Sequence, residues 1–179
     1  MKTLITTLTL FLLAGTTSVW AATENVVASN GVRVGIDKDE FKPYIDVSAD
    51  WISELKGELP VEQKGYLFFI RKDKSGSRRY VQGSITYYGD WRWYDRAYLF
   101  GGEPAKFISL DRKVGKCSVG RFGSSCSMTE DFQLEITSAN LSEADDLRIK
   151  IASQKGIRDF VVVIPRSHII AVEEVAGKQ

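Results

Sequence analysis

Residues 91–100 combine cations and aromatic rings at a spacing that could bind a ligand. If this segment is a strand, side chains two apart share a face, which places on one side Arg92, Tyr94, Arg96, Tyr98 and Phe100. Guanidinium groups bind anions and stack on aromatic rings. The pattern predicts a surface for a flat or anionic ligand. The alternative is that the arginines cover the tyrosines and pack against a neighbouring strand.

Two acidic residues are the candidates for carboxylate catalysis. Asp95 falls among apolar residues on the other side of that segment, so it needs a partner such as Arg112 or a backbone donor if it is buried. Glu130 falls on the apolar side of a later alternating segment, and we expect it at the strand end, where a sheet opens to water. Because two carboxylates can hydrolyse glycosidic bonds, these positions define a possible hydrolase site.

The two cysteines, Cys117 and Cys126, flank a segment rich in glycine and serine. We expect them to form a disulfide that closes a flexible loop, because redox pairs are usually spaced Cys-x-x-Cys and zinc sites need more ligands than His168 adds. Such a bridge contributes about 2.5–3 kcal/mol on the chain-entropy model. Arg121 and Phe122 at the loop tip form a second candidate binding site, unless Phe122 folds back onto the core.

Other chemistry lacks support in the sequence. His168 is the single histidine, and no Gly-x-Ser-x-Gly motif accompanies it, so nucleophilic catalysis is not predicted. The acidic run at residues 37–40 lacks the glycine and the distant glutamate of a calcium loop. No glycine-rich phosphate loop follows a predicted strand. We therefore expect no metal and no cofactor.

The first 21 residues have the pattern of a secretory signal peptide. Lys2 supplies the positive start, residues 4–14 the apolar middle, and Val19 and Ala21 the small positions around a cleavage site. The apolar part is shorter than the roughly 20 residues that span a bilayer, so stable membrane insertion is not expected. Export to the periplasm or the medium follows, and the cysteines would meet an oxidising environment there.

The remaining chain, residues 22–179, is predicted to be one domain. Its length suits a single core, and removal of Lys2 leaves equal numbers of basic and acidic residues. Overall charge therefore indicates no nucleic-acid partner.

Short alternating segments dominate this domain. Runs at residues 31–36, 44–49, 79–88, 128–137 and 147–151 alternate with period two. The aromatic, β-favouring run at residues 65–70 should form a hairpin with residues 79–88. Residues 22–30 look loosely held, and residues 50–55 fit a helical turn or a strand end equally well. Residues 160–164 are apolar on both faces, which predicts a central strand.

The period becomes helical after Pro165, which fits the first helical position, with Gly177 just beyond the end. With about eight or nine strands in total, the predicted fold is all-β: an antiparallel sandwich or barrel with a C-terminal α-helix packed against it.

Three functions fit these observations. The first is an exported binding module that recognises a protein surface or a glycan without catalysis. The second is a hydrolase of cell-wall or extracellular polysaccharide that uses Asp95 and Glu130. The third is a structural subunit of an envelope assembly, in which the aromatic face would be an interface.

Overall fold

The computed structural model describes residues 22–56, 62–120, 123–137, 139, 141, 145–154, 156 and 158–179. The predicted signal peptide at residues 1–21 and the predicted binding residues Arg121 and Phe122 lie outside this part of the chain. The elements in chain order are β1 (Ala22–Val27), β2 (Arg33–Lys38), β3 (Tyr44–Ala49), β4 (Ile52–Lys56), β5 (Glu62–Asp73), β6 (Gly76–Tyr88), β7 (Tyr94–Leu99), β8 (Pro104–Gly120), β9 (Gly123–Ile136), β10 (Leu147–Ser153), β11 (Phe160–Ile164) and α1 (Arg166–Gly177).

The predicted architecture, all-β and antiparallel with a C-terminal helix, is confirmed. The described strands form one large open sheet in the order β1-β2-β3-β5-β6-β9-β8-β7-β10-β11, and β4 pairs with β5. There are more strands than expected. Residues 22–27, expected to be loosely held, form β1 against β2, and the segment at residues 50–55, ambiguous in the sequence, contains β4. β3 and β4 lie end to end along β5, which spans both of them. The predicted hairpin is the β5–β6 pair.

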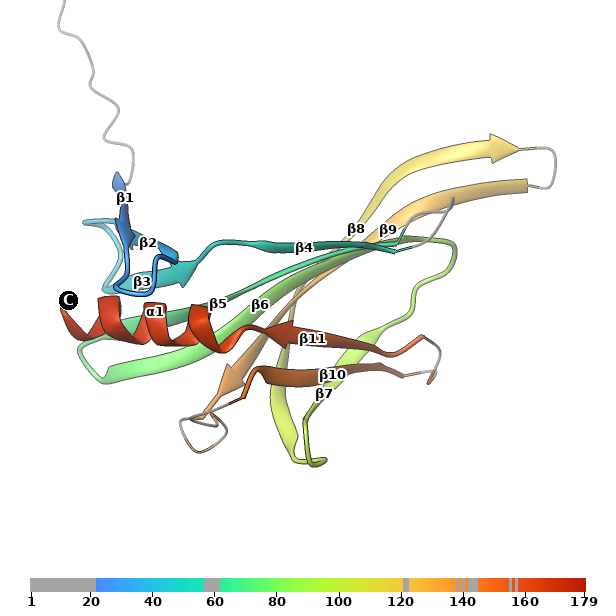
Figure 1. Cartoon of the computed structure of the whole chain (residues 1–179). Coiled ribbons are helices and arrows are strands. Elements are labelled where there is room, and N and C mark those ends of the chain that lie inside the picture. The colour runs from blue at the N-terminus through green and yellow to red at the C-terminus, as the bar shows by residue number, and fades with distance from the viewer. Residues whose placement is uncertain are drawn as a thin grey trace, which may run out of the picture.

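The sheet curls so strongly that its far end returns over its own inner face. Figure 1 shows β10 and β11 lying below β4 and β5, and β11 contacts β5 directly. The Phe160 ring of β11 lies 6.1 Å from the Phe132 ring of β9. The buried apolar side chains of both parts form one core. The inner face of the sheet is therefore covered largely by the sheet itself.

The position of β11 in the sheet differs from the prediction. Its apolar composition predicted a central strand, but among the described residues it pairs only with β10, at the end of the sheet order. Phe160, Val162 and Ile164 face the core, whereas Val161 is 42% exposed. β11 is apolar because one face packs into the core, and its other face tolerates valine in partial contact with water.

Helix α1 follows β11 directly and covers the other end of the sheet, where it contacts β2, β3 and β5. It begins at Arg166, one residue later than predicted, and includes Gly177. Its buried side chains, Ile169, Val172 and Ala176 among them, form the predicted apolar stripe. The helix closes the region that β10 and β11 leave uncovered (Figure 1).

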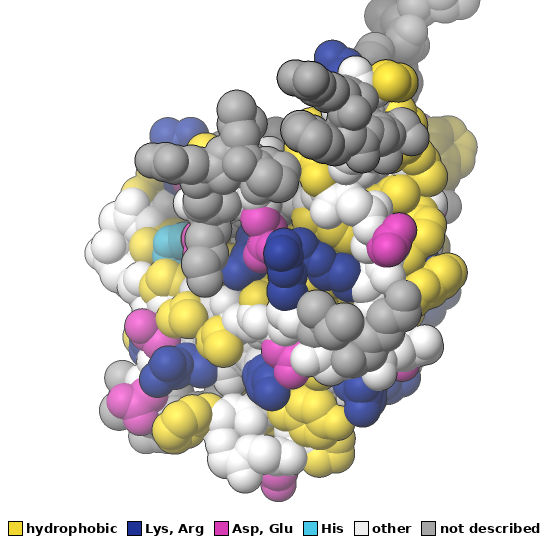
Figure 2. All heavy atoms as spheres, turned by 90° about the vertical axis from the view of Figure 1, so that its right-hand side faces the viewer, with side chains coloured by type: hydrophobic (Ala, Val, Ile, Leu, Met, Phe, Trp, Pro, Cys, Tyr) yellow, Lys and Arg dark blue, Asp and Glu magenta, His cyan; other side chains and the backbone are white. Residues whose placement is uncertain are grey.

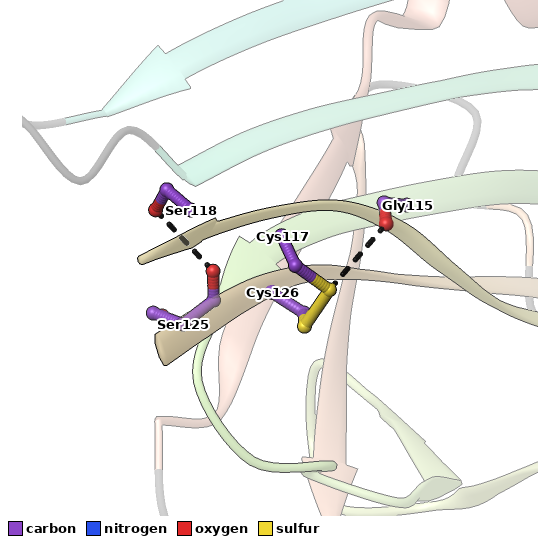
Figure 3. Close-up of a disulfide and its surroundings, with 5 residues drawn as sticks. All are labelled: Gly115, Cys117, Ser118, Ser125 and Cys126. Atoms are coloured by element: carbon purple, nitrogen blue, oxygen red, sulfur yellow. Dashed lines mark hydrogen bonds between the residues drawn. A yellow bond between two sulfur atoms is a disulfide. The ribbon is translucent and has the colours of Figure 1, made fainter. Parts of the chain in front are cut away.

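The two cysteines are joined, and the described residues between them, 118–120 and 123–125, are paired strand and not the expected flexible loop. Cys117 and Cys126 lie directly opposite each other in the β8–β9 ladder, with the sulfur atoms 2.00 Å apart, and the ladder continues to the Gly120–Gly123 pair. Figure 3 shows the disulfide, with the Ser118 hydroxyl donating to the Ser125 carbonyl at 3.4 Å. β8 and β9 thus form a ribbon that projects from the sheet (Figure 1). Small residues suit it because it has no core to pack against.

The packing of an aromatic ring against β6 leaves no room for a side chain at Gly83. Gly83 lies opposite Phe132 in the β6–β9 ladder, and the ring lies across the glycine. A Cβ atom at Gly83 would lie 2.4 Å from Cζ of Phe132. The ring also stacks on Phe107 of β8 at 5.7 Å, so it has little room to move.

Gly83→Ala should therefore lower the free energy of unfolding by about 1–3 kcal/mol, the usual cost of overpacking a core. Urea denaturation of the purified protein measures this change. Ser84→Ala, one residue along and on the opposite face, is the matched control and should change it by less than about 0.5 kcal/mol. A Gly83→Ala protein as stable as the parent would contradict the packing described here.

Candidate functional site

A β-bulge in β7 divides the predicted row of cations and tyrosines between two faces. In the β7–β10 ladder Arg96 pairs with Ala152 while Tyr94 pairs with the next residue, Ser153, which leaves Asp95 as the extra residue. Arg92 and Tyr94 are buried inside the curled sheet, whereas Arg96 is exposed on the outside. The shared face predicted for Arg92, Tyr94, Arg96 and Tyr98 is therefore wrong, because the bulge shifts the alternation by one residue.

Inside the sheet, ionised side chains gather at one end of the core. We call Glu62, Lys64, Arg92, Arg112 and Glu130 the inner charged cluster. They come from β5, the segment before β7, β8 and β9. Figure 2 looks onto the end of the molecule where β5 begins, and it shows Lys and Arg side chains gathered around Asp or Glu near the middle of that end.

Glu130 is the most highly bonded member of the cluster. Its carboxylate accepts hydrogen bonds from the Tyr87 hydroxyl, from the backbone N–H groups of Trp93 at 3.1 Å and Tyr94 at 3.0 Å, and from Nε of Arg112 at 3.1 Å. Only 3% of the residue is exposed. The expected position at a strand end open to water is therefore wrong. The carboxylate is buried because four donors replace its water shell.

Backbone geometry at Trp93 makes two of these bonds possible. Trp93 has φ +57°, in the left-handed region that non-glycine residues enter at a cost of about 1–2 kcal/mol. The turn presents two consecutive N–H groups to Glu130 and leaves the indole partly exposed, with the Arg112 guanidinium 4.8 Å from its ring. The hydrogen bonds to Glu130 offset the cost of this conformation.

Asp95 does not take the partner proposed for it. It lies on the outside, 3.2 Å from Nε of Arg96, while Arg112 pairs with Glu130 instead. Asp95 and Glu130 therefore lie on opposite faces of the curled sheet and do not form a carboxylate pair. This separation again follows from the β-bulge.

Arg92 is the central cation of the cluster. Its Nη1 donates to Glu62 at 2.7 Å and to the Tyr94 hydroxyl at 3.1 Å, and its guanidinium lies 4.0 Å from the centre of the Tyr87 ring. Burial and the hydrogen bond to Glu130 raise the pKa of Tyr87, and burial raises the pKa of Tyr94. Both phenols therefore stay neutral near pH 7 and act as hydrogen-bond donors.

The sequence patterns did not predict a functional role for Lys64 or Glu62. Lys64 is 7% exposed, with its ammonium 3.7 Å from Glu62 and 4.8 Å from the centre of the Phe160 ring. A signal was present, because Lys64 alternates in phase with Tyr66 and Phe68, which are buried. A lysine in that phase predicts a buried cation.

The outer face of the sheet carries the remaining predicted residues, Arg96 and Tyr98. Tyr98 lies opposite Lys150 of β10, and Lys150 lies opposite Val161 of β11. A surface groove of about 360 Å³ lies beside these residues. We call it the outer groove, and its lining includes Tyr98, Phe100, Gly101, Arg148, Lys150 and Val161.

Cations and an aromatic ring alternate around the outer groove. Phe100 is 85% exposed, and the Arg148 guanidinium lies 5.6 Å from the centre of its ring. Lys150 pairs with Asp159 at 2.9 Å and keeps 55% of its side chain exposed. This face presents an exposed aromatic ring beside the Arg148 guanidinium and beside Lys150, which is paired with Asp159.

Comparison with protein-family models, curated proteins and solved structures finds no match for this chain. Among the described residues, no helix is long and apolar enough to cross a membrane. The same part of the chain contains no group of three or more His, Cys, Asp or Glu residues placed to hold a metal ion.

Replacing Glu130 tests how much of the fold depends on it. Glu130→Ala should lower the free energy of unfolding by about 3–5 kcal/mol, because Arg112 would be left without its buried partner. The matched control is Glu135→Ala on the same strand, whose partner Lys106 is 69% exposed; it should lose less than about 1 kcal/mol. Urea denaturation of both variants measures the difference. Equal losses would contradict the anchoring role of Glu130.

Alkaline pH should destabilise the protein through its buried phenols. Burial and a hydrogen bond to Glu54 raise the pKa of Tyr66 from 10.0 to about 12. An unfolded chain releases these protons near pH 10, so the stabilisation is complete below pH 10 and is lost as pH rises from 10 toward 12. Denaturation at several pH values, with phenol ionisation followed by absorbance, measures the slope. Tyr66→Phe should reduce this slope by up to about one proton, and an unchanged slope would refute the assignment.

Proposed function

We propose that this chain is an exported, non-catalytic binding domain that recognises an acidic glycan through the outer groove. The observation that carries the proposal is the row of Phe100, Arg148 and Lys150 around an open groove of about 360 Å³. The apolar face of a sugar ring packs against an exposed aromatic ring, while Arg and Lys bind its carboxylate groups.

Export is part of the proposal. The predicted signal peptide at residues 1–21 supports it, and so does the Cys117–Cys126 disulfide, because disulfides persist mainly in oxidising compartments. The destination is the periplasm or the surrounding medium, where acidic polysaccharides are accessible ligands.

The geometry favours binding over hydrolysis. A glycosidase needs two carboxyl groups about 5–9.5 Å apart across one cleft. Asp95 and Glu130 face opposite sides of the sheet, and the Glu130 oxygens are engaged by four donors. These two positions therefore give the hydrolase hypothesis no support.

The proposal is tested with an oligogalacturonate as the acidic probe and a neutral cello-oligosaccharide of the same length as the ligand control. Arg148→Ala combined with Lys150→Ala should weaken oligogalacturonate binding at least tenfold, or about 1.4 kcal/mol, measured by calorimetry at low salt. Binding of the parent protein should also weaken as salt rises.

A matched control variant removes the same charge elsewhere. It carries Arg78→Ala and Lys106→Ala, whose side chains are 51% and 69% exposed on β6 and β8. This control should bind oligogalacturonate like the parent. Equal weakening in both variants would show that only net charge matters, and failure of the parent to prefer the acidic probe would refute the proposed function.

A further inference from the structure

A pocket of about 660 Å³ lies at the end of the sheet where helix α1 ends. We call it the helix-end pocket. It is lined by the end of β2, the turn into β3, the start of β3, the end of β5 and Gln179 after the helix. Figure 1 shows the last turn of α1 beside β3 and β5 at this end of the sheet. The pocket is larger than the outer groove, and its volume is within the range of about 300–1,000 Å³ that is typical of small-molecule sites.

Two lysines and an isoleucine form one row across the sheet in this pocket. Ile45 of β3 lies opposite Lys38 of β2 on one side and opposite Lys72 of β5 on the other. Val47, two residues along β3 and therefore on the same face, is buried in the core. The row thus continues the inner face of the sheet, and it exchanges apolar side chains for two cations at the point where the core ends.

The lysines of the pocket are available to an anion. Lys72 donates to the Ala176 carbonyl at 2.9 Å, which uses one of the three hydrogens of its ammonium group. Lys38 and Lys74 make no hydrogen bond or ion pair with any of the described residues. Three ammonium groups from β2, β5 and the turn after β5 therefore line one pocket, and none of them has a carboxylate partner in the described part of the chain.

Two of the three carboxylates in the pocket lining are already paired. Asp73 accepts from Nη2 of Arg78 at 2.5 Å, and Asp39 lies 3.7 Å from the ammonium nitrogen of Lys42. Glu40 is exposed and is the one lining carboxylate that lacks a cation partner within the described ranges. Unpaired lysines therefore outnumber unpaired carboxylates, so the pocket favours a negatively charged ligand.

The pocket also has an apolar wall, which Pro43, Tyr44 and Ile45 form. The Arg71 guanidinium lies 4.0 Å from the centre of the Tyr44 ring and is itself bonded to Asp46 at 2.7 Å. This stack fixes the ring before any ligand binds, which lowers the entropic cost of binding. A ligand for this pocket should therefore combine an anionic group with an apolar part.

We propose that the helix-end pocket binds a small organic phosphate monoester, with its phosphate group at Lys38, Lys72 and Lys74 and its organic part against Tyr44 and Ile45. Near neutral pH such a phosphate carries a charge of about −1.5 to −2 and offers three acceptor oxygens, one for each lysine. A carboxylate has a single charge and two oxygens, so it matches the three cations less well. The lining residues of this pocket are distinct from those of the outer groove, so the proposal does not depend on glycan binding.

The first test compares three probes by calorimetry on the full protein at constant ionic strength. Phenyl phosphate should bind at least about fivefold more tightly than phenyl sulfate, which has the same ring but only one negative charge. It should also bind at least about fivefold more tightly than inorganic phosphate, which lacks the ring. The first comparison tests the lysines, and the second tests the apolar wall.

A double variant removes the two lysines that have no other contacts. Lys38→Gln combined with Lys74→Gln should weaken phenyl phosphate binding at least about tenfold and leave the melting temperature unchanged. The matched control is Lys106→Gln combined with Lys113→Gln, which removes the same charge from side chains that are 69% and 61% exposed on β8. This control should bind phenyl phosphate like the parent.

Nuclear magnetic resonance on the parent protein locates the site without any variant. Phenyl phosphate should shift the amide signals of Lys74 and Gln179, and it should leave those of Phe100 and Lys150 in the outer groove unchanged. The Lys38→Gln, Lys74→Gln variant should keep its binding of oligogalacturonate, so the failure of this proposal and the failure of the proposed function can be told apart.

Three results would overturn the proposal. The first is phenyl sulfate binding as tightly as phenyl phosphate, because the pocket would then not select a phosphate group. The second is an equal loss of affinity in both double variants, which would reflect only the net charge of the protein. The third is a set of shifted amide signals that excludes Lys74 and Gln179, which would place the ligand elsewhere.

Discussion

The burial of one carboxylate allows this sheet to curl over itself. Glu130 of β9 binds donors from the two strands that pair with β9, β6 and β8, and from the start of β7, which lies one strand further along the sheet. The chain leaves β6 at Tyr88 and enters β7 through a left-handed residue, Trp93. Without an acceptor at this point, two consecutive N–H groups would be buried unsatisfied. The carboxylate thus fixes where β7 starts. The positions of β10 and β11 depend on β7 in turn, because β10 pairs with β7 and β11 pairs with β10.

Local periodicity predicted much of the fold because strand formation follows the alternation of side chains. Tyr44–Ala49, Phe160–Ile164 and the β5–β6 hairpin have the predicted positions. What the alternation could not reveal is which strands become neighbours, since that depends on contacts between distant segments. β11 is the clear case, because its composition suits a central strand and its position is at the end of the sheet order.

The candidate sites were less predictable for the same reason. The β-bulge at Asp95 adds one residue to β7 opposite β10, and no residue type near Asp95 predicts it. Because of the bulge, the residues predicted to share one face lie on two: Arg92 faces the inside of the sheet and Arg96 faces the outside. The partners of Arg92 are also distant, since Glu62 lies 30 residues earlier in the chain. Sequence patterns place a residue on a face, but the pairing of buried charges depends on the closed structure.

The ribbon formed by β8 and β9 has a consequence for self-association. Near its tip the two strands pair only with each other in the described part of the chain, apart from the bond that the Gly89 N–H donates to Cys126. Its outer edges therefore present open backbone groups, the usual template for aggregation and strand exchange. The covalent link between Cys117 and Cys126 prevents the two strands from slipping in register or separating, so neither can leave its partner to pair with a strand of another copy. Oxidation of this cysteine pair thus guards the ribbon against strand exchange, while its outer edges stay open to pairing.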